Sequence, residues 1–452
     1  MLPAPIIYHM QLEVNYREIL KIAGPICLAL IIPQINHITN TAFLGRLGEF
    51  ELAANGIAGI YYLVMYMIAY GLNNGMQVLI ARRAGQRQFS GIGQLFSNGI
   101  QLGLVFSLLA IAITLLAAPW FFSKSLHDKH IYEAAVSFIH IRIWGLPFLM
   151  LLNMANAFYI GSGHSKVLAA TSLCQEFVNI AFDYFLIFGK AGFPHMGLNG
   201  AAVASIIAEI TGCSVAFSIL FLKKYHLKYE LFRYLKIQWN IVLNILNVSA
   251  PIIVQFLFSI GSWFVFFIFI EHLGERPLAV SNMLRSIFGL FGIFTWSLAA
   301  ACNTMVSNVI GQGRSNLVFS AIRKIAWLSL LCALTVCIII NLFPYTLLKI
   351  YTTNNDLIAA AIPSIRVITI STLLMAISAV VMSGVLGTGN TKMNLITEIA
   401  AVIGYLWYCD IVIERMHSPL QWAWGADFIY WVIIFIMSFW YLRSGRWKGK
   451  EI

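Results

Sequence analysis

The chain has 452 residues, of which 60% are hydrophobic and only 10% are charged. A water-soluble domain carries about 25% charged residues, so this composition excludes a soluble globular protein and indicates one that lies in lipid. The formal net charge of +11 raises the alternative of a nucleic-acid-binding protein.

Long apolar runs divide the chain into candidate transmembrane segments. A helix of about 20 apolar residues crosses ~30 Å of hydrocarbon. The runs are continuous and do not alternate, which favours helices over a closed barrel. We therefore predict an all-α integral membrane protein with twelve transmembrane helices. In chain order, their predicted ranges are 19–43, 52–80, 95–118, 132–160, 167–189, 197–222, 243–270, 278–309, 320–345, 356–386, 393–413 and 421–443.

The basic residues predict the orientation of these spans. Of the 29 Lys and Arg residues, 19 lie at the termini or in loops after even-numbered spans, and 7 lie in loops after odd-numbered spans. Because Lys and Arg are retained on the cytoplasmic side, we expect a multi-pass protein with both termini cytoplasmic. The positive charge is then a topology signal, and we expect the lipid bilayer, not nucleic acid, as a partner.

The sequence also contains an internal repeat. A shift of 226 residues places Gly85-Gln86 on Gly311-Gln312 and the stretch from Gly161 on the one from Gly387. Each half holds six spans, so the halves share one orientation and predict two parallel six-helix repeats around a central cavity, with alternating access by rocking. We expect an N-terminal six-helix lobe at 1–222, a cytoplasmic linker at 223–240 and a C-terminal six-helix lobe at 241–452.

Ionisable residues inside the spans are candidates for ion coupling, because such residues are costly in lipid and usually functional. In the fifth span, Glu176, Asn179 and Asp183 follow i, i+3, i+7 spacing and share one helix face. Two carboxylates in a low dielectric cannot both ionise easily, so at least one is expected to hold a proton or share a cation. A structural hydrogen-bond network is the alternative role.

The first span carries a second polar group. Gln34, His37 and Thr41 share one face, and Asn40 borders it. Histidine titrates near neutral pH, so His37 is a further candidate for coupling, although a helix–helix hydrogen bond would also account for it.

Other polar and aromatic residues could line a cavity for a cationic substrate, which carboxylates and cation–π contacts would attract. Interface packing is the alternative role for the aromatic residues, and Glu398 could serve either in a cavity wall or in packing. The candidate cavity residues are Gln34, Tyr66, Tyr70, Trp263, Trp296 and Glu398.

Several motifs together resemble a known family. They are the stretch from Asn40 to Gly48, Gly85-Gln86 after the second span, Asn179 to Asp183 and Gly197 to Ala202. In order and partly repeated, they resemble the MATE (multidrug and toxic compound extrusion) transporters of prokaryotic type. The resemblance implies a secondary active antiporter in the cell (inner) membrane that exports amphipathic, cationic organic compounds in exchange for Na⁺ or H⁺. It implies no cofactor, and we expect a monomer.

The resemblance also implies a cation site. In the family branch with its site in the N-terminal half, the matching positions are Asn40, Asn179, Asp183 and Ser205. The family's Asp in the first span is Asn40 here, which removes one negative charge that His37 or Glu176 could replace. A Na⁺ site would then use Asp183, Asn179 and Ser205, and no other metal site is expected. The other branch uses a Glu in the seventh span, where this chain has Ser259.

Two other functions remain as alternatives. One is a flippase for lipid-linked oligosaccharide or another lipid, whose anionic head groups would require several cationic residues in the cavity. The other is a membrane enzyme. The sequence has no His-Glu-x-x-His, Gly-x-Ser-x-Gly or Walker-type motif, so we expect neither catalysis nor direct use of ATP.

Overall fold

The structure, a computed structural model, describes residues 11–234 and 236–450. Helices are its only regular secondary structure over these residues, and each of the twelve predicted spans coincides with a helix or with a closely linked pair. Most helices begin and end a few residues beyond the predicted apolar range, since their polar ends continue the backbone hydrogen bonding past the hydrocarbon. The largest shortfall is at 320–345, where the helix ends at Leu342 because Pro344 starts a new short helix.

Among the described residues, eleven helical segments are long and apolar enough to cross a membrane, by length and composition. The remaining predicted span is α6 (Lys166–Phe188), which has 23 residues. Its length is sufficient, but Glu176, Asn179 and Asp183 lower its mean hydropathy. The predicted span that does not qualify by composition is thus the helix that carries three of the candidate coupling residues, Glu176, Asn179 and Asp183.

The chain separates into two compact units. One unit comprises Leu28–Ser249, and the other comprises the described residues of Met1–Cys27 and Ala250–Ile452. The unit boundaries fall inside α1 (Tyr16–Gly45) and α9 (Trp239–Glu271). The predicted lobes 1–222 and 241–452, with their linker, remain a prediction.

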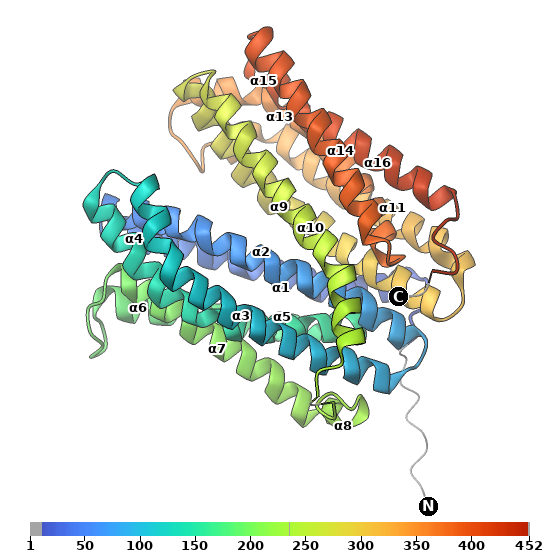
Figure 1. The fold of residues 1–452 in the computed structure, drawn as a ribbon. Helices are drawn as coiled ribbons and strands as arrows, with labels where there is room; N and C mark the ends of the chain where they lie inside the picture. Colours follow the sequence, from blue (N-terminus) through green and yellow to red (C-terminus); the bar gives the residue numbers. More distant parts are fainter. Residues whose placement is uncertain (1–10, 235, 451–452) are drawn as a thin grey trace, which may run out of the picture. The chain divides into compact units, whose positions relative to one another are not determined.

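The Leu28–Ser249 unit contains seven further helices (Figure 1). They are α2 (Glu49–Gly85), α3 (Phe89–Ser125), α4 (Lys129–Arg142), α5 (Leu146–Gly161), α6, α7 (Leu198–Leu222) and α8 (Tyr225–Lys228). A 3-10 turn, Ile143–Gly145, joins α4 to α5 within one predicted span.

The second unit contains the C-terminal helices. They are α10 (Glu275–Gly311), α11 (Val318–Leu342), α12 (Pro344–Leu348), α13 (Asn355–Gly387), α14 (Thr391–Cys409), α15 (Leu420–Ala423) and α16 (Ala426–Arg443). A π-helical turn, Asp410–Arg415, extends α14.

The two units repeat the same packing order. In the first, α2 and α3 pack on α5, and α6 packs along α7; in the second, α10 and α11 pack on α13, and α14 packs along α16 (Figure 1). The helices α2 and α10 each have 37 residues and end at the repeated Gly-Gln pair. The internal repeat found in the sequence therefore corresponds to a repeated arrangement within each unit.

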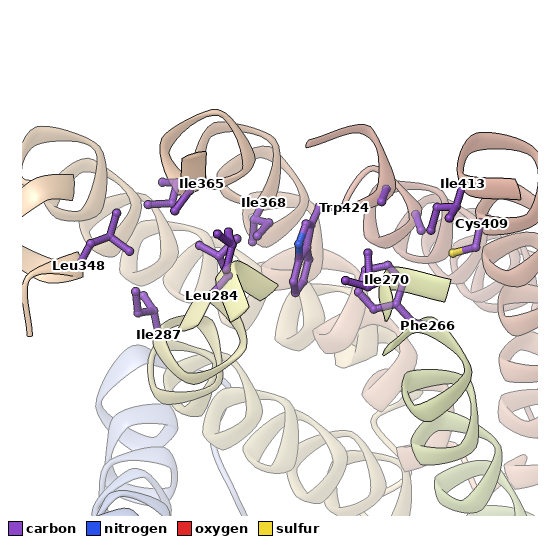
Figure 2. Packing of buried hydrophobic residues seen from close by; sticks show 14 of the residues in the cluster. Phe266, Ile270, Leu284, Ile287, Leu348, Ile365, Ile368, Cys409, Ile413 and Trp424 are labelled. Atoms are coloured by element: carbon purple, nitrogen blue, oxygen red, sulfur yellow. The ribbon is translucent and has the colours of Figure 1, made fainter. Parts of the chain in front are cut away.

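Apolar side chains fill the interior of each unit. In the second unit, Phe266, Ile270 and Leu284 lie around Trp424 (Figure 2). The indole nitrogen of Trp424 donates a hydrogen bond to Ser281 at 3.2 Å. The rings of Phe266 and Trp424 are 5.1 Å apart in an edge-to-face arrangement. This apolar layer borders the polar groups of α14 and α16.

Candidate functional site

Two glycine-dependent turns position α6 against α7. Gly189 ends α6 with a φ of +63°, and Gly197 precedes α7 with a φ of +54°, values that glycine adopts without strain. At Gly200 the helices are in direct contact, because a Cβ there would lie 2.7 Å from the backbone of Leu186. Farther along, a Cβ at Gly212 would meet Gln175. The helices therefore run antiparallel, which puts Ser205 level with Asp183.

The polar face of α6 is buried. Glu176 and Asn179 are each 7% exposed, and Asp183 is fully buried. Glu176 lies close enough to Asp183 for their charges to interact. The i, i+3, i+7 spacing thus places two carboxyl groups and one amide in the interior of the unit.

The first helix runs beside α6 in the same direction. Ser172 donates to the carbonyl of Ala29 at 3.3 Å, and Asn36 Nδ2 donates to Glu176 Oε2 at 2.6 Å. One turn past Asn40, Phe43 reaches the end of α6, where its ring lies 5.6 Å from that of Phe188. Asn36, Asn40 and Phe43 share a face. Asn40 therefore lies level with Asn179 and Asp183.

Several buried oxygen atoms on these helices have no hydrogen-bond partner within the described residues. They are Oδ1 and Oδ2 of Asp183 and Oδ1 of Asn36, Asn40 and Asn179. An ionised carboxylate without a partner is very unfavourable in a low dielectric. A proton on Asp183, or a cation held by these oxygens, would remove that penalty. The arrangement is therefore chemically suited to binding either one.

A buried ion pair lies in the same unit. Arg142, at the end of α4, donates from Nη1 to Glu209 Oε2 at 2.9 Å and from Nη2 to Oε1 at 2.6 Å. Tyr62 donates to the same carboxylate at 3.0 Å, and the guanidinium lies 3.9 Å from the centre of the Tyr62 ring. Arg142 is also close enough to Glu176 and Asp183 for its charge to act on them. The carboxyl groups of Glu176, Asp183 and Glu209 and the guanidinium of Arg142 thus lie in the same part of the interior.

The side chains at this site offer oxygen atoms, whereas transition-metal centres commonly use imidazole and thiolate ligands. No group of three or more His, Cys, Asp or Glu side chains with metal-binding geometry occurs in the part of the chain that the structure describes. Carboxylate and amide oxygens prefer hard cations or protons.

Comparisons with known proteins decide the family. The MatE family model matches residues 25–185 and again 251–407, two stretches that begin 226 residues apart. The chain belongs to the MatE family. The repeat predicted from the sequence is thus confirmed as two copies of the family's unit.

Relatives and solved structures agree over nearly the whole chain. The chain is 25% identical to a probable multidrug resistance protein NorM of Thermotoga maritima, over 96% of this chain and 94% of that protein. It is 27% identical to a probable multidrug resistance protein NorM of Synechocystis, over 98% and 97% of the two chains. Its fold matches an outward-facing multidrug resistance MATE family transporter of the MOP superfamily with a TM-score of 0.90, at 19% identity over 96% of both chains.

Membership in the MatE family shows the broad functional class of this protein. This MatE protein is a multi-pass membrane transporter and not an enzyme, and the predicted resemblance and all-α fold are confirmed. A second structural neighbour, a MOP superfamily transporter from Pyrococcus furiosus, has a TM-score of 0.89 at 18% identity and covers 98% of both chains. At this identity the likeness supports the fold alone.

The remaining predicted site residues of this MatE protein are dispersed. Gln34, His37 and Thr41 are exposed on α1, whereas Asn40 is half-buried. The rings of Tyr66 and Tyr70 stack 6.1 Å apart. In the other unit Trp263 and Trp296 are 39% and 46% exposed, and Glu398 is buried. The predicted roles of these residues in coupling or in a substrate cavity remain predictions.

Sequence reasoning missed some partners in the MatE site. It did not single out Asn36, although Asn36 lies one turn before Asn40 and donates to Glu176. It also did not pair Arg142 with Glu209, which is 67 residues away. The i, i+4 spacing of the two asparagines was an available signal, but the ion pair depends on the contact between α4 and α7.

Proposed function

We propose that this protein exports amphipathic, cationic organic compounds across the cell (inner) membrane in exchange for inward Na⁺ or H⁺. Family membership and bacterial relatives named as probable multidrug resistance proteins support this proposal. The buried group of three carboxyls, Glu176, Asp183 and Glu209, is accompanied by the single guanidinium of Arg142, and this excess of carboxyls favours a cationic substrate over an anionic one.

The proposed coupling group is the Asp183 carboxyl. The supporting observation is that its side chain is fully buried and that neither oxygen has a hydrogen-bond partner within the described residues. Asn179, Asn40 and Ser205 would supply further oxygens at the same level, and Glu176 or His37 would tune the charge. A proton or Na⁺ at Asp183 would neutralise the carboxylate. Binding and release of that ion would therefore change the electrostatic free energy of the buried charged groups in this unit.

The ion dependence of substrate binding tests the proposal. Binding of ethidium to the purified protein is measured while Na⁺ concentration and pH are varied separately. The wild-type affinity should depend on one of the two ions, and Asp183→Asn, which keeps the shape and removes the charge, should abolish that dependence. Asp356→Asn, at an exposed position, should behave as wild type. An unchanged ion dependence in Asp183→Asn would reject the assignment.

Further proposals concern topology and assembly. We propose that both termini and the 223–240 linker face the cytoplasm, that the six-helix lobes span 1–222 and 241–452, and that the protein acts as a monomer. The distribution of Lys and Arg supports the orientation. In vesicles, movement of ethidium driven by an imposed ion gradient would distinguish the antiporter from a lipid flippase.

A further inference from the structure

We propose that Glu398 on α14 forms a second proton-binding site, located in the C-terminal half and separate from the Asp183 site. In this proposal Glu398 takes up and releases a proton as the transporter works, and its immediate partners are Tyr430, Ser259 and Gln255. The proposal does not rest on the role of Asp183.

The Glu398 carboxyl is enclosed. It is 1% exposed, and Tyr430 on α16 donates a hydrogen bond to its Oε1 at 2.7 Å. Ser259 and Gln255 of α9 also lie within hydrogen-bonding reach. On either side, Tyr430 packs against two apolar clusters, one around Phe266 and Trp424 (Figure 2) and one around Ala401 and Ile434. The carboxyl group therefore lies in a low-dielectric interior.

The Glu398 carboxyl group has no cationic partner within residues 11–234 and 236–450, where it forms no ion pair with Lys, Arg or His. A buried carboxyl without a cation avoids the large penalty of desolvation by holding a proton. When protonated, Glu398 can keep the hydrogen bond from Tyr430 on one carboxyl oxygen and hold its proton on the other. Gln255, on α9, brings a further uncharged side chain to this carboxyl group, and its own buried Oε1 accepts no hydrogen bond from the described residues.

A buried tyrosine hydroxyl beside Tyr430 is a second, independent feature of this region. Tyr405 is 2% exposed, and its hydroxyl has no hydrogen-bond partner among the described residues. Its ring lies 6.0 Å from that of Tyr430, and it is close enough to Asp427 for their charges to interact. The titratable group in contact with Glu398 is therefore Tyr430 on α16, and Tyr430 connects it to Asp427 on α16 and to Tyr405 and Cys409 on α14.

The internal repeat explains why this site suits a proton better than Na⁺. The repeat counterparts of Asn40, Asn179 and Asp183, 226 residues later, are Phe266, Tyr405 and Cys409. With the one-residue slip, the counterpart of Ser205 is Tyr430. At these four positions the C-terminal half thus has one phenyl ring, two phenols and a thiol, with no carboxylate or amide oxygen, whereas hard cations require several oxygen ligands, carboxylates among them.

Infrared difference spectroscopy of the protein in lipid tests the proposal. A carbonyl band of a protonated carboxylic acid should appear on lowering the pH within the range in which the protein transports, and Glu398→Gln should remove that band. Asp183→Asn should keep it, which separates this proposal from the coupling role of Asp183. Glu414→Gln, which removes a partly exposed acid in the π-helical turn that extends the same helix, is the matched control and should also keep it.

A second variant and a transport measurement complete the test. Tyr430→Phe retains the ring but removes the hydrogen bond to Glu398, so the carbonyl band of Glu398 should move to higher frequency. If Glu398→Gln does not fold, this frequency shift assigns the band to Glu398. The pH profile of ethidium efflux should flatten in Glu398→Gln. The proposal is overturned if the band survives in Glu398→Gln, is removed by Asp427→Asn instead, does not change with pH, or keeps its frequency in Tyr430→Phe. An unchanged pH profile of efflux in Glu398→Gln would overturn it as well.

Discussion

The buried Arg142–Glu209 pair permits a quantitative prediction about stability. The side chains are 12% and 4% exposed, and two hydrogen bonds of 2.9 and 2.6 Å join them. Removing one partner of such a pair leaves an uncompensated buried charge and costs about 3–5 kcal/mol. We therefore expect Arg142→Met and Glu209→Leu each to lower the free energy of unfolding by about 3 kcal/mol or more.

The double variant should behave differently from the sum of its parts. Replacing both partners by apolar side chains removes the desolvation penalty together with the attraction, and such exchanges are often neutral. Arg142→Met combined with Glu209→Leu should then be far more stable than the two single losses added together. Tyr62→Phe is the matched control, because it keeps the ring under the guanidinium and removes one hydrogen bond to a charged group, worth about 1.5–3 kcal/mol.

Denaturant titration of the purified protein in mixed micelles, arranged as a double-mutant cycle, measures these differences. A coupling energy of several kcal/mol is expected. If each single variant loses less than about 1 kcal/mol, the pair behaves like a solvent-exposed salt bridge, and the reasoning from burial is wrong.

Three further predictions concern packing, pH and topology. Gly200→Ala should destabilise the protein by about 1–3 kcal/mol, because its Cβ would lie 2.7 Å from the backbone of α6, whereas Gly261→Ala, with nothing within 4 Å, should be neutral or stabilising; thermal unfolding compares them. The hydrogen bond from His272 to Glu414, 2.6 Å long, raises the pKa of His272 above its ordinary value, so its stabilising contribution should be complete below that ordinary value and disappear as the pH rises through the raised one. Comparing the pH dependence of unfolding in wild type and His272→Gln measures this, and identical profiles would contradict it. In a cysteine-free background, Arg233→Cys, at an exposed linker position, should resist impermeant thiol reagents in intact cells and react after permeabilisation; labelling of intact cells would reverse the proposed orientation.

The sequence alone was sufficient for the fold class, the twelve helical segments and the duplication. A continuous apolar run indicates a membrane span by its length alone. In lipid the backbone N–H and C=O groups must be hydrogen-bonded within the segment itself, and a helix achieves this. The repeat was visible because glycines at helix ends recur at one offset, and the family match at residues 25 and 251 has the same spacing. The burial of the polar face of α6 also followed from local spacing, since helical periodicity places Glu176 and Asp183 on one side.

The pairing of polar groups from distant segments required the tertiary structure. The spacing within α1 suggested a face with His37, but the contact with α6 is made by the face with Asn36, because helix rotation is decided by packing against neighbours. Arg142 meets Glu209, and Glu398 meets Tyr430, only where separate helices touch. In a membrane helix, the pattern of apolar residues does not specify how the helix is rotated about its axis or which helix it packs against. The reason is that lipid and the protein interior are similarly apolar. The chemistry of each buried charge was therefore decided by contacts between helices, which no local pattern encodes.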